Sequence, residues 1–599
     1  MTKIDYKKYI MWSAIAVLYV LCFRIVIQSG YMFDDMWTYI DKGVAISNDT
    51  SIAQMVSESI QRWASSYGRI LIFSFYCEFA LCYLPLVVYK GMIVAAMFLD
   101  GLVLAGIIRE LTGSKRAAYL TVIIFPAVLS MRATYYTGVY GFHGLVQLCL
   151  LLVLSAVYCY IRYRRTEKTA YQVASCVFWF MALGMYEVSY VLCVCFIAAL
   201  ICIDGWDYVK KNFWKSIRTG LPQIIIMIFW VAANVIARML ATGDYDGATP
   251  SFSISRIIVT FIKQCSGSLG FGAALADWKC QEPGFWKEFI SEYVGFTQIL
   301  TYALVFAALI YVLLRLKDAS VNKLSSMIWM GAILVVMPSL LISMSVKYQK
   351  EVDWFQGYIP SYFGSWGFAL IMAATVVIIG RKIVNSKAFI CFNVAAALVF
   401  TGIFAFDNIV GAYSVDDVNM FYQNDVNTML DSIDSGMFDD IGEDEYFLDV
   451  SYSTYTLDGD YTNRAYTTWL GRKCKARGWD DIYADKGNTA VLNDEYARMK
   501  SKGFKVVNHL AKWYAVMADC NGLELQLGDD GYEYKAYVSG MDMFVYDYSP
   551  DTFTCKDISG SRIRINLSDG KVVKTGRYGS IYHFDFPDDV DISSIVIGE

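Results

Sequence analysis

Long apolar runs separated by short polar segments occupy the first 407 residues of the chain. Most runs are near the ~20 residues that a helix needs to cross the ~30 Å hydrocarbon core of a bilayer. The pattern therefore predicts a polytopic α-helical membrane protein with about 11 spans. The runs cover residues 9–29, 84–108, 117–137, 139–161, 170–184, 188–204, 219–241, 296–315, 326–345, 360–380 and 387–406.

One further apolar segment, residues 69–83, has a more ambiguous pattern. Its sequence is RILIFSFYCEFALCY, which includes Glu78, and Pro85 follows closely. As a full span it would reverse the orientation of every later span. We therefore interpret it as re-entrant or interfacial, and a different split of the apolar runs would raise the count to about 12 or 13 spans.

Clusters of lysine and arginine mark alternate ends of the predicted spans. They lie at residues 109–116, 162–168, 210–218, 315–323 and 381–387. Cytoplasmic loops are enriched in these two residues, so the clusters predict which ends face the cytoplasm. The outside then holds residues 30–68, 132–142, 185–187, 242–295, 346–359 and everything after 407. Helical stretches in the 30–68 and 242–295 loops are too polar to span and suit the membrane surface.

The last third of the chain has a different pattern. A helix is expected from about 415 to 434, opened by Ser414 and Asp417 as a capping box. Further on, alternating segments such as YEYKAYV and MFVYDY predict strands. We therefore expect a transmembrane body over 1–407, a helical connector over 408–440, and a soluble extracytoplasmic α+β domain over 441–599.

Composition and charge support this division. The chain is 56% hydrophobic and only 18% charged, where soluble proteins average about 25% charged residues. Residues 408–599 contain 33 acidic and 18 basic residues, net −15, and the remainder is net +10. The more soluble part is acidic, which argues against a nucleic-acid partner. With three histidines in all, a histidine-built metal site is not expected.

Adjacent carboxylates form the strongest local motif. Asp34 and Asp35 lie in the sequence YMFDDMW, directly after the first span and on the outside. Such a pair could act as a general base on a hydroxyl, or hold a divalent cation such as Mg²⁺ or Mn²⁺. The simpler interpretation is a solvated loop whose acids cap the next helix.

Two further motifs accompany the acidic pair. They are LGMYE at 183–187, in a short outside hairpin, and GYIPSYFG at 357–364, which enters a late span. Together with the acidic pair, they resemble the GT-C superfamily of membrane glycosyltransferases, in particular the bacterial serotype-converting O-antigen glucosyltransferases. The resemblance covers roughly residues 1–410. It implies transfer of a sugar from a polyprenyl-phosphate carrier by direct displacement at the anomeric carbon, with Asp34 or Asp35 as the catalytic acid.

Other candidates lie at the outside ends of spans. A guanidinium or ammonium there could neutralise a carrier phosphate, and Lys347 and Lys350 depart from the positive-inside pattern. A carboxylate in the short hairpin at Glu187 is costly unless it has a partner, which suggests an acid/base or sugar-binding role. The substrate-binding candidates are Arg132, Tyr136, His143, Arg238, Lys347, Lys350, Tyr358 and Tyr362. Snorkelling cations and bundle-interior hydrogen bonds are the structural alternatives.

These observations favour a multi-pass enzyme of the bacterial cytoplasmic membrane. We expect it to take a polyprenyl-phosphate sugar and glycosylate a surface glycan or glycolipid. A transporter or flippase of a lipid-linked sugar is the alternative, although no internal repeat is visible. A non-catalytic surface protein would leave so many spans unexplained. The sequence contains no Gly-rich phosphate loop, which argues against a nucleotide-sugar enzyme.

Overall fold

The computed structural model separates the chain into two compact units. The first comprises residues 1–29, 33–35 and 56–415, and the second comprises 30–32, 36–55 and 416–599. The structure describes residues 6–134, 136–243, 245, 247, 249–272, 285–316, 323–434, 446–449, 459–473, 475–477, 505–507, 524–527, 534–539, 542–549, 552–554, 563–567, 572–574, 582–583 and 592–597.

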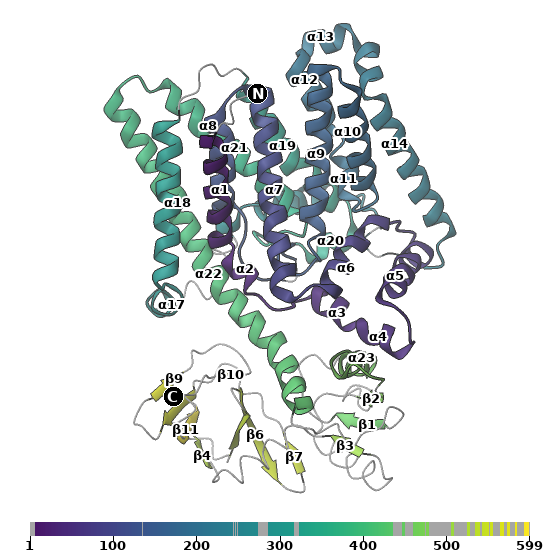
Figure 1. The fold of residues 1–599 in the computed structure, drawn as a ribbon, viewed down its shortest axis with the longest axis vertical. Coiled ribbons are helices and arrows are strands. Elements are labelled where there is room, and N and C mark those ends of the chain that lie inside the picture. The colour runs from purple at the N-terminus through teal and green to yellow at the C-terminus, as the bar shows by residue number, and fades with distance from the viewer. Residues whose placement is uncertain are drawn as a thin grey trace. The chain divides into compact units, whose positions relative to one another are not determined.

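Helices account for most of the described residues up to 434 (Figure 1). In chain order they are α1 Tyr6–Cys22, α2 Arg24–Ile27, α3 Asp34–Ile40, α4 Lys42–Ser47, α5 Ile52–Tyr67, η1 Ile72–Ser74, α6 Phe75–Tyr83, α7 Leu86–Thr112, α8 Lys115–Val128, α9 Leu145–Thr166, α10 Thr169–Leu183, α11 Val188–Val191, α12 Val194–Asp204, α13 Trp206–Lys211, α14 Phe213–Leu240, α15 Ile254–Ser266, α17 Phe285–Tyr293, α18 Phe296–Arg315, α19 Ser325–Ser343, α20 Val346–Glu351, α21 Ser361–Lys382 and α22 Ser386–Asp434.

Seven of the described helices are long and apolar enough to cross a membrane, which makes this a multi-pass membrane protein. They are α7, α9, α14, α18, α19, α21 and the first part of α22. The other predicted spans contain shorter helices (α1, α8, α10, and α11 with α12), so the total of about 11 stays a prediction. Residues 69–83 form a 3₁₀ turn and the nine-residue helix α6. Nine residues rise only about 14 Å, too little for a helical span.

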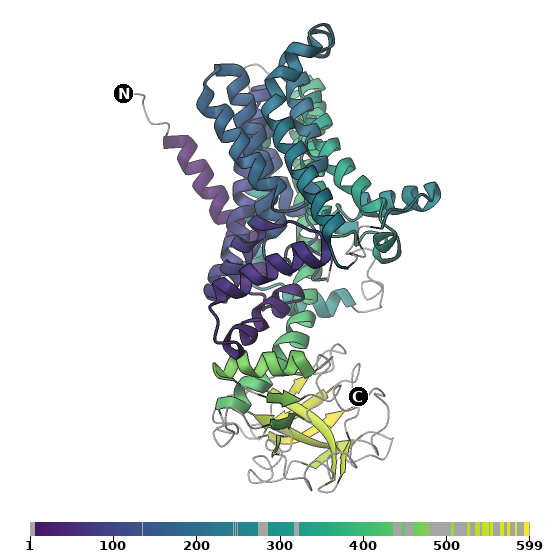
Figure 2. The same ribbon diagram turned by 90° about the vertical axis from the view of Figure 1, so that its right-hand side faces the viewer.

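The centre of the first unit is a bundle of nearly parallel helices, visible in both views (Figures 1 and 2). Helix α8 lies inside it, and every residue of α8 except Lys115 is buried. Trp366 of α21 stacks on Phe125 of α8 with ring centroids 3.6 Å apart. Glycines at 331 and 367 let α19 and α21 approach closely, because a Cβ at Gly367 would lie 2.4 Å from the Gly331 carbonyl oxygen.

Contacts at one end of this bundle join two of the segments that contain predicted basic clusters, 109–116 and 162–168. Glu110, at the end of α7, forms ion pairs with Arg162 and Arg165 at the end of α9. Arg164 pairs with Asp204, which ends α12. Segments far apart in the sequence therefore place their charges together, as the alternation of the clusters predicts. The side of the membrane on which they lie stays a prediction.

The loops at the opposite end are tied to one another by backbone hydrogen bonds. Thr242 and Gly243 donate to the carbonyls of Ser65 and Ser66. Pro250 bridges to Ser345. Phe73 N donates to Gly184 O at 3.0 Å. The predicted outside loops thus form one connected layer at this end of the first unit.

The expectation of a separate helix at 415–434 is wrong. Helix α22 is continuous from Ser386 to Asp434. Ser414 does not begin a helix, because it lies within α22 and its hydroxyl donates to the carbonyl of Ala133. Its side chain serves tertiary packing rather than capping.

Among the described residues after 445, the second unit contains strands and one helix. They are β1 Tyr446–Asp449, α23 Gly459–Leu470, β2 Lys475–Arg477, β3 Lys505–Val507, β4 Glu524–Leu527, β5 Tyr534–Ser539, β6 Asp542–Ser549, β7 Thr552–Thr554, β8 Ile563–Leu567, β9 Val572–Lys574, β10 Tyr582–His583 and β11 Ile592–Ile597. One sheet has the order β2-β1-β3, and the larger has β10-β6-β5-β4-β11-β8-β9, with β7 on β6. A single extracytoplasmic domain over 441–599 stays a prediction.

Candidate active site

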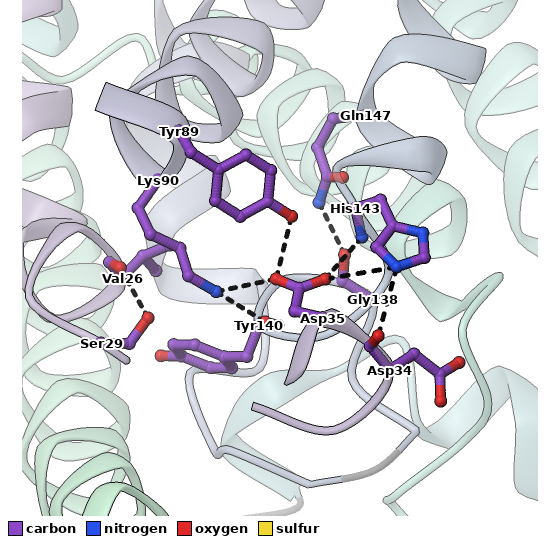
Figure 3. A network of polar contacts seen from close by, with 10 residues as sticks. All are labelled: Val26, Ser29, Asp34, Asp35, Tyr89, Lys90, Gly138, Tyr140, His143 and Gln147. Atoms are coloured by element: carbon purple, nitrogen blue, oxygen red, sulfur yellow. Dashed lines mark hydrogen bonds and ion pairs between the residues drawn. The ribbon is translucent and has the colours of Figure 1, made fainter. Parts of the chain in front are cut away.

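The acidic pair lies in the first turn of the short helix α3. Phe33, immediately before it, has a left-handed backbone (φ 53°), which turns the chain sharply into the helix. Consecutive residues on a helix point about 100° apart. The two carboxylates therefore diverge, as Figure 3 shows. Their environments differ accordingly.

Asp35 lies in a closed network of partners. Its side chain is fully buried, as is that of Lys90 in α7, whose Nζ lies 3.0 Å from Asp35 Oδ2. The Tyr89 hydroxyl donates to the same oxygen at 2.9 Å, and the backbone N–H of His143 donates to Oδ1 at 2.8 Å (Figure 3). A buried ion pair needs such additional hydrogen bonds to offset desolvation. Both oxygens of Asp35 are thus occupied.

The loop before α9 completes this network. Lys90 Nζ also donates to the carbonyl of Tyr140 at 2.8 Å. The Tyr140 hydroxyl in turn donates to Met131 O, and the Gln147 side chain donates to Gly138 O. The loop at 131–143 is therefore held against the acidic pair, which makes the position of Asp35 dependent on α7 and α9 together.

Asp34 has a different orientation. Its residue is half-buried, and its carboxylate points away from the Asp35 network (Figure 3). Its backbone carbonyl lies 3.3 Å from His143 Nε2. The predicted candidate His143 thus touches both acids, through its backbone N–H and through its ring. Of the two carboxylates, that of Asp34 is the one directed away from the fixed ion pair.

A second charged cluster surrounds Glu187. Arg69 binds it through two parallel bonds, Nε to Oε1 at 2.5 Å and Nη2 to Oε2 at 2.7 Å. Burial by itself would raise the pKa of Glu187, but the charge and hydrogen bonds of Arg69 outweigh burial and lower it. In this arrangement Glu187 anchors an arginine. A role as base or sugar ligand stays a prediction.

Aromatic rings extend the Arg69 cluster toward α20 and α21. The Arg69 guanidinium lies 4.4 Å from the centroid of the Tyr245 ring, and Tyr245 and Tyr348 hydroxyls are 3.2 Å apart. The Tyr348 ring packs on Tyr358 at 4.5 Å, and Tyr358 packs on Tyr136 at 5.3 Å. The structure thus joins two predicted tyrosines, Tyr136 and Tyr358, to the Glu187 cluster.

Three predicted cations lie around these clusters in different ways. Lys347 Nζ lies 6.0 Å above the Tyr245 ring and 4.0 Å from Glu351. Lys350 and Arg238 are exposed, and the backbone of Arg238 lies against Gly68. Of these three, Lys347 contacts the aromatic cluster.

The remaining two candidates have other settings. Arg132 is half-buried in the 131–143 loop, where its carbonyl accepts a bond from Thr137. Tyr362 is fully buried in α21, and its hydroxyl donates to Asp100 of α7 at 2.6 Å. Tyr362 therefore belongs to the bundle interior and satisfies a buried carboxylate there.

A divalent cation near Asp34 and Asp35 stays a prediction, and the two carboxylates have different surroundings. A divalent ion held by both carboxylates would need oxygens that face one site. Asp35 instead faces the ammonium of Lys90, and its carboxylate is separated from that of Asp34 (Figure 3). No group of three or more metal-ligating His, Cys, Asp or Glu side chains occurs among the described residues.

Several residues of these clusters were not predicted from the sequence. Lys90 is one of two charged residues inside the apolar run 84–108, and an intramembrane charge is expensive unless it has a partner. The position of Lys90 in an apolar run therefore indicates that it has a partner, but no sequence pattern identifies Asp35 as that partner. Arg69 began the ambiguous apolar segment 69–83, and Tyr245 lay in a loop without a pattern.

Comparisons with known proteins give only distant structural similarity. No protein-family description and no curated protein matches the chain. The structure is similar to ArnT from Cupriavidus metallidurans bound to undecaprenyl phosphate, with 11% identity and a TM-score of 0.34 over 85% of this chain and 91% of that one. It is also similar to the arabinosyltransferase EmbB from Mycobacterium smegmatis, with 10% identity and a TM-score of 0.28 over 71% and 42%.

Proposed function

We propose that this protein transfers a sugar from a polyprenyl-phosphate donor to a hydroxyl of a surface glycan or glycolipid, on the outer face of the membrane. The observation that supports this most is the division of the acidic pair. Asp35 is buried and held by Lys90, Tyr89 and His143, whereas the Asp34 carboxylate is directed away from them. We assign Asp34 as the base and Asp35 as a positioning residue.

The proposed step is a single displacement. The acceptor oxygen attacks the anomeric carbon while its proton passes to the Asp34 carboxylate. The bond between the anomeric carbon and the phosphate oxygen breaks, and polyprenyl phosphate leaves with the electron pair. A single displacement inverts the anomeric configuration. Asp35 is poorly suited to accept the proton, because its oxygens already accept from an ammonium, a phenol and an amide.

The leaving phosphate needs cationic partners. Arg69 uses Nε and Nη2 for Glu187, which fixes the plane of its guanidinium. A guanidinium fixed in this way presents Nη1 in a defined direction and suits a phosphate oxygen. Lys347, whose Nζ lies 6.0 Å from the centroid of the Tyr245 ring, is the second candidate. The aromatic rings of Tyr245, Tyr348 and Tyr358 near these cations offer a face on which a sugar can stack.

The test is a deletion strain complemented with wild type, Asp34→Asn, Asp34→Glu or Asp35→Asn. We expect Asp34→Asn to lower transfer at least about 100-fold, as loss of a general base does. The lipid-linked donor should accumulate while the variant is present at normal membrane levels. Full restoration of the glycan by Asp34→Asn would refute the assignment.

A transporter of the same lipid-linked sugar predicts a different result in detergent. Purified transporter would yield no glycosylated product when donor and acceptor are mixed without a membrane. Purified transferase would yield product, and Asp34→Asn would not. This assay therefore separates the two functions without reference to a cell.

A further inference from the structure

The end of α3 and all of α4 pack against a helix from the last third of the chain, within the second unit. Arg464 of α23 forms an ion pair with Asp41, which lies between α3 and α4. The Thr468 hydroxyl donates to the carbonyl of Ile40, the last residue of α3, at 2.7 Å. One turn of α23 thus binds the junction between α3 and α4 through an ion pair and a hydrogen bond to a backbone carbonyl.

Close packing reinforces this contact. A Cβ at Gly43 of α4 would lie 2.2 Å from the carbonyl oxygen of Arg464, so only glycine allows this approach. Tyr466 and Thr467 of α23 are fully buried. A more exposed ion pair, Lys473 with Asp49 at 2.5 Å, lies beyond the end of α23. The interface therefore has a buried centre and a solvent-exposed charged rim.

We propose that α23 is a positioning element for the acidic pair and sets the direction of α3. This inference rests on the proposed function. Helix α3 has seven residues, and such a helix is a rod of about 10 Å. Asp34 begins this rod and Ile40 ends it, at the carbonyl that Thr468 binds. Loss of the hydrogen bond to the Ile40 carbonyl should therefore change the direction of α3 and displace the Asp34 side chain.

The kinetic consequence follows from the geometry that proton transfer requires. A base displaced by about 1 Å loses on the order of 100-fold in rate, even when the substrates still bind. Loosening α23 should therefore lower kcat and leave the KM for the donor nearly unchanged. A helix that bound acceptor directly would show the opposite result, a raised KM for the acceptor.

The experiment uses the full-length protein with substitutions at this interface. Gly43→Leu inserts a side chain against the Arg464 backbone. Arg464→Asp removes the ion pair, and Arg464→Asp with Asp41→Arg restores it with reversed charges. Gly402→Leu is the matched control, because a Cβ at Gly402 meets nothing within 4 Å. Membrane level and gel-filtration profile of each purified variant monitor folding.

We expect Gly43→Leu and Arg464→Asp to lower kcat at least about 10-fold at unchanged donor KM. The reversed pair should recover most of that loss, and Gly402→Leu should match wild type. Retention of kcat within about twofold by well-folded Gly43→Leu would overturn the inference, as would a raised acceptor KM at constant kcat. If wild type itself transfers no sugar, or Asp34→Asn keeps full activity, the proposed function has failed, which is a separate result.

Discussion

Replacing Lys90 with methionine removes the cation that lies 3.0 Å from Asp35 Oδ2, at a place where both side chains are fully buried. The Asp35 carboxylate would then lack its countercharge, and Tyr140 O would lose a donor. Breaking one half of a buried ion pair costs about 3–5 kcal/mol, whereas replacing both halves with neutral groups is often nearly neutral. The double variant Lys90→Met with Asp35→Asn should therefore be more stable than either single variant.

The assay for this prediction is a double-mutant cycle on purified protein in detergent. The fraction of protein that stays monodisperse by gel filtration after heating gives an apparent midpoint for each variant. We expect wild type and the double variant to have the highest midpoints, with both single variants well below them. Equal midpoints for wild type and Lys90→Met would refute the reasoning, and so would a double variant that loses the sum of the two single effects.

Two further predictions concern positions outside this pair. Arg69 lowers the pKa of Glu187. The ionised Glu187 therefore stabilises the protein above its unfolded pKa, about 4.3, and this stabilisation is lost as the pH falls through the folded pKa. Glu187→Gln should be less stable than wild type at neutral pH and should depend less on acid, as measured by thermal midpoints between pH 3 and 7. Gly367→Val should lower the midpoint by forcing α21 away from the Gly331 carbonyl, an overpacking cost of about 1–3 kcal/mol, whereas Gly402→Val should match wild type.

Helix α3 contains the acidic pair at its beginning. Residues 36–55 belong to the same compact unit as the last third of the chain, and α3 begins in one unit and ends in the other. Substitutions in α23 are therefore expected to change the chemistry without touching a substrate.

The sequence by itself determined the apolar helices, because the hydrophobic effect and bilayer thickness act on runs of neighbouring residues. It also determined the shared end of the basic clusters at 109–116 and 162–168 and singled out Asp34 and Asp35. Each of the seven described helices that can span a membrane overlaps a predicted run.

Only the tertiary structure decided which acid is buried and which partners it has. Lys90 lies 55 residues from Asp35, Glu187 lies 118 from Arg69, and Thr468 lies 428 from Ile40. A hydrogen bond or ion pair forms over about 3 Å, and nothing in the local pattern of a chain specifies which distant group will arrive there. Packing of the helices makes that choice, so the partners of a buried charge are a property of the fold.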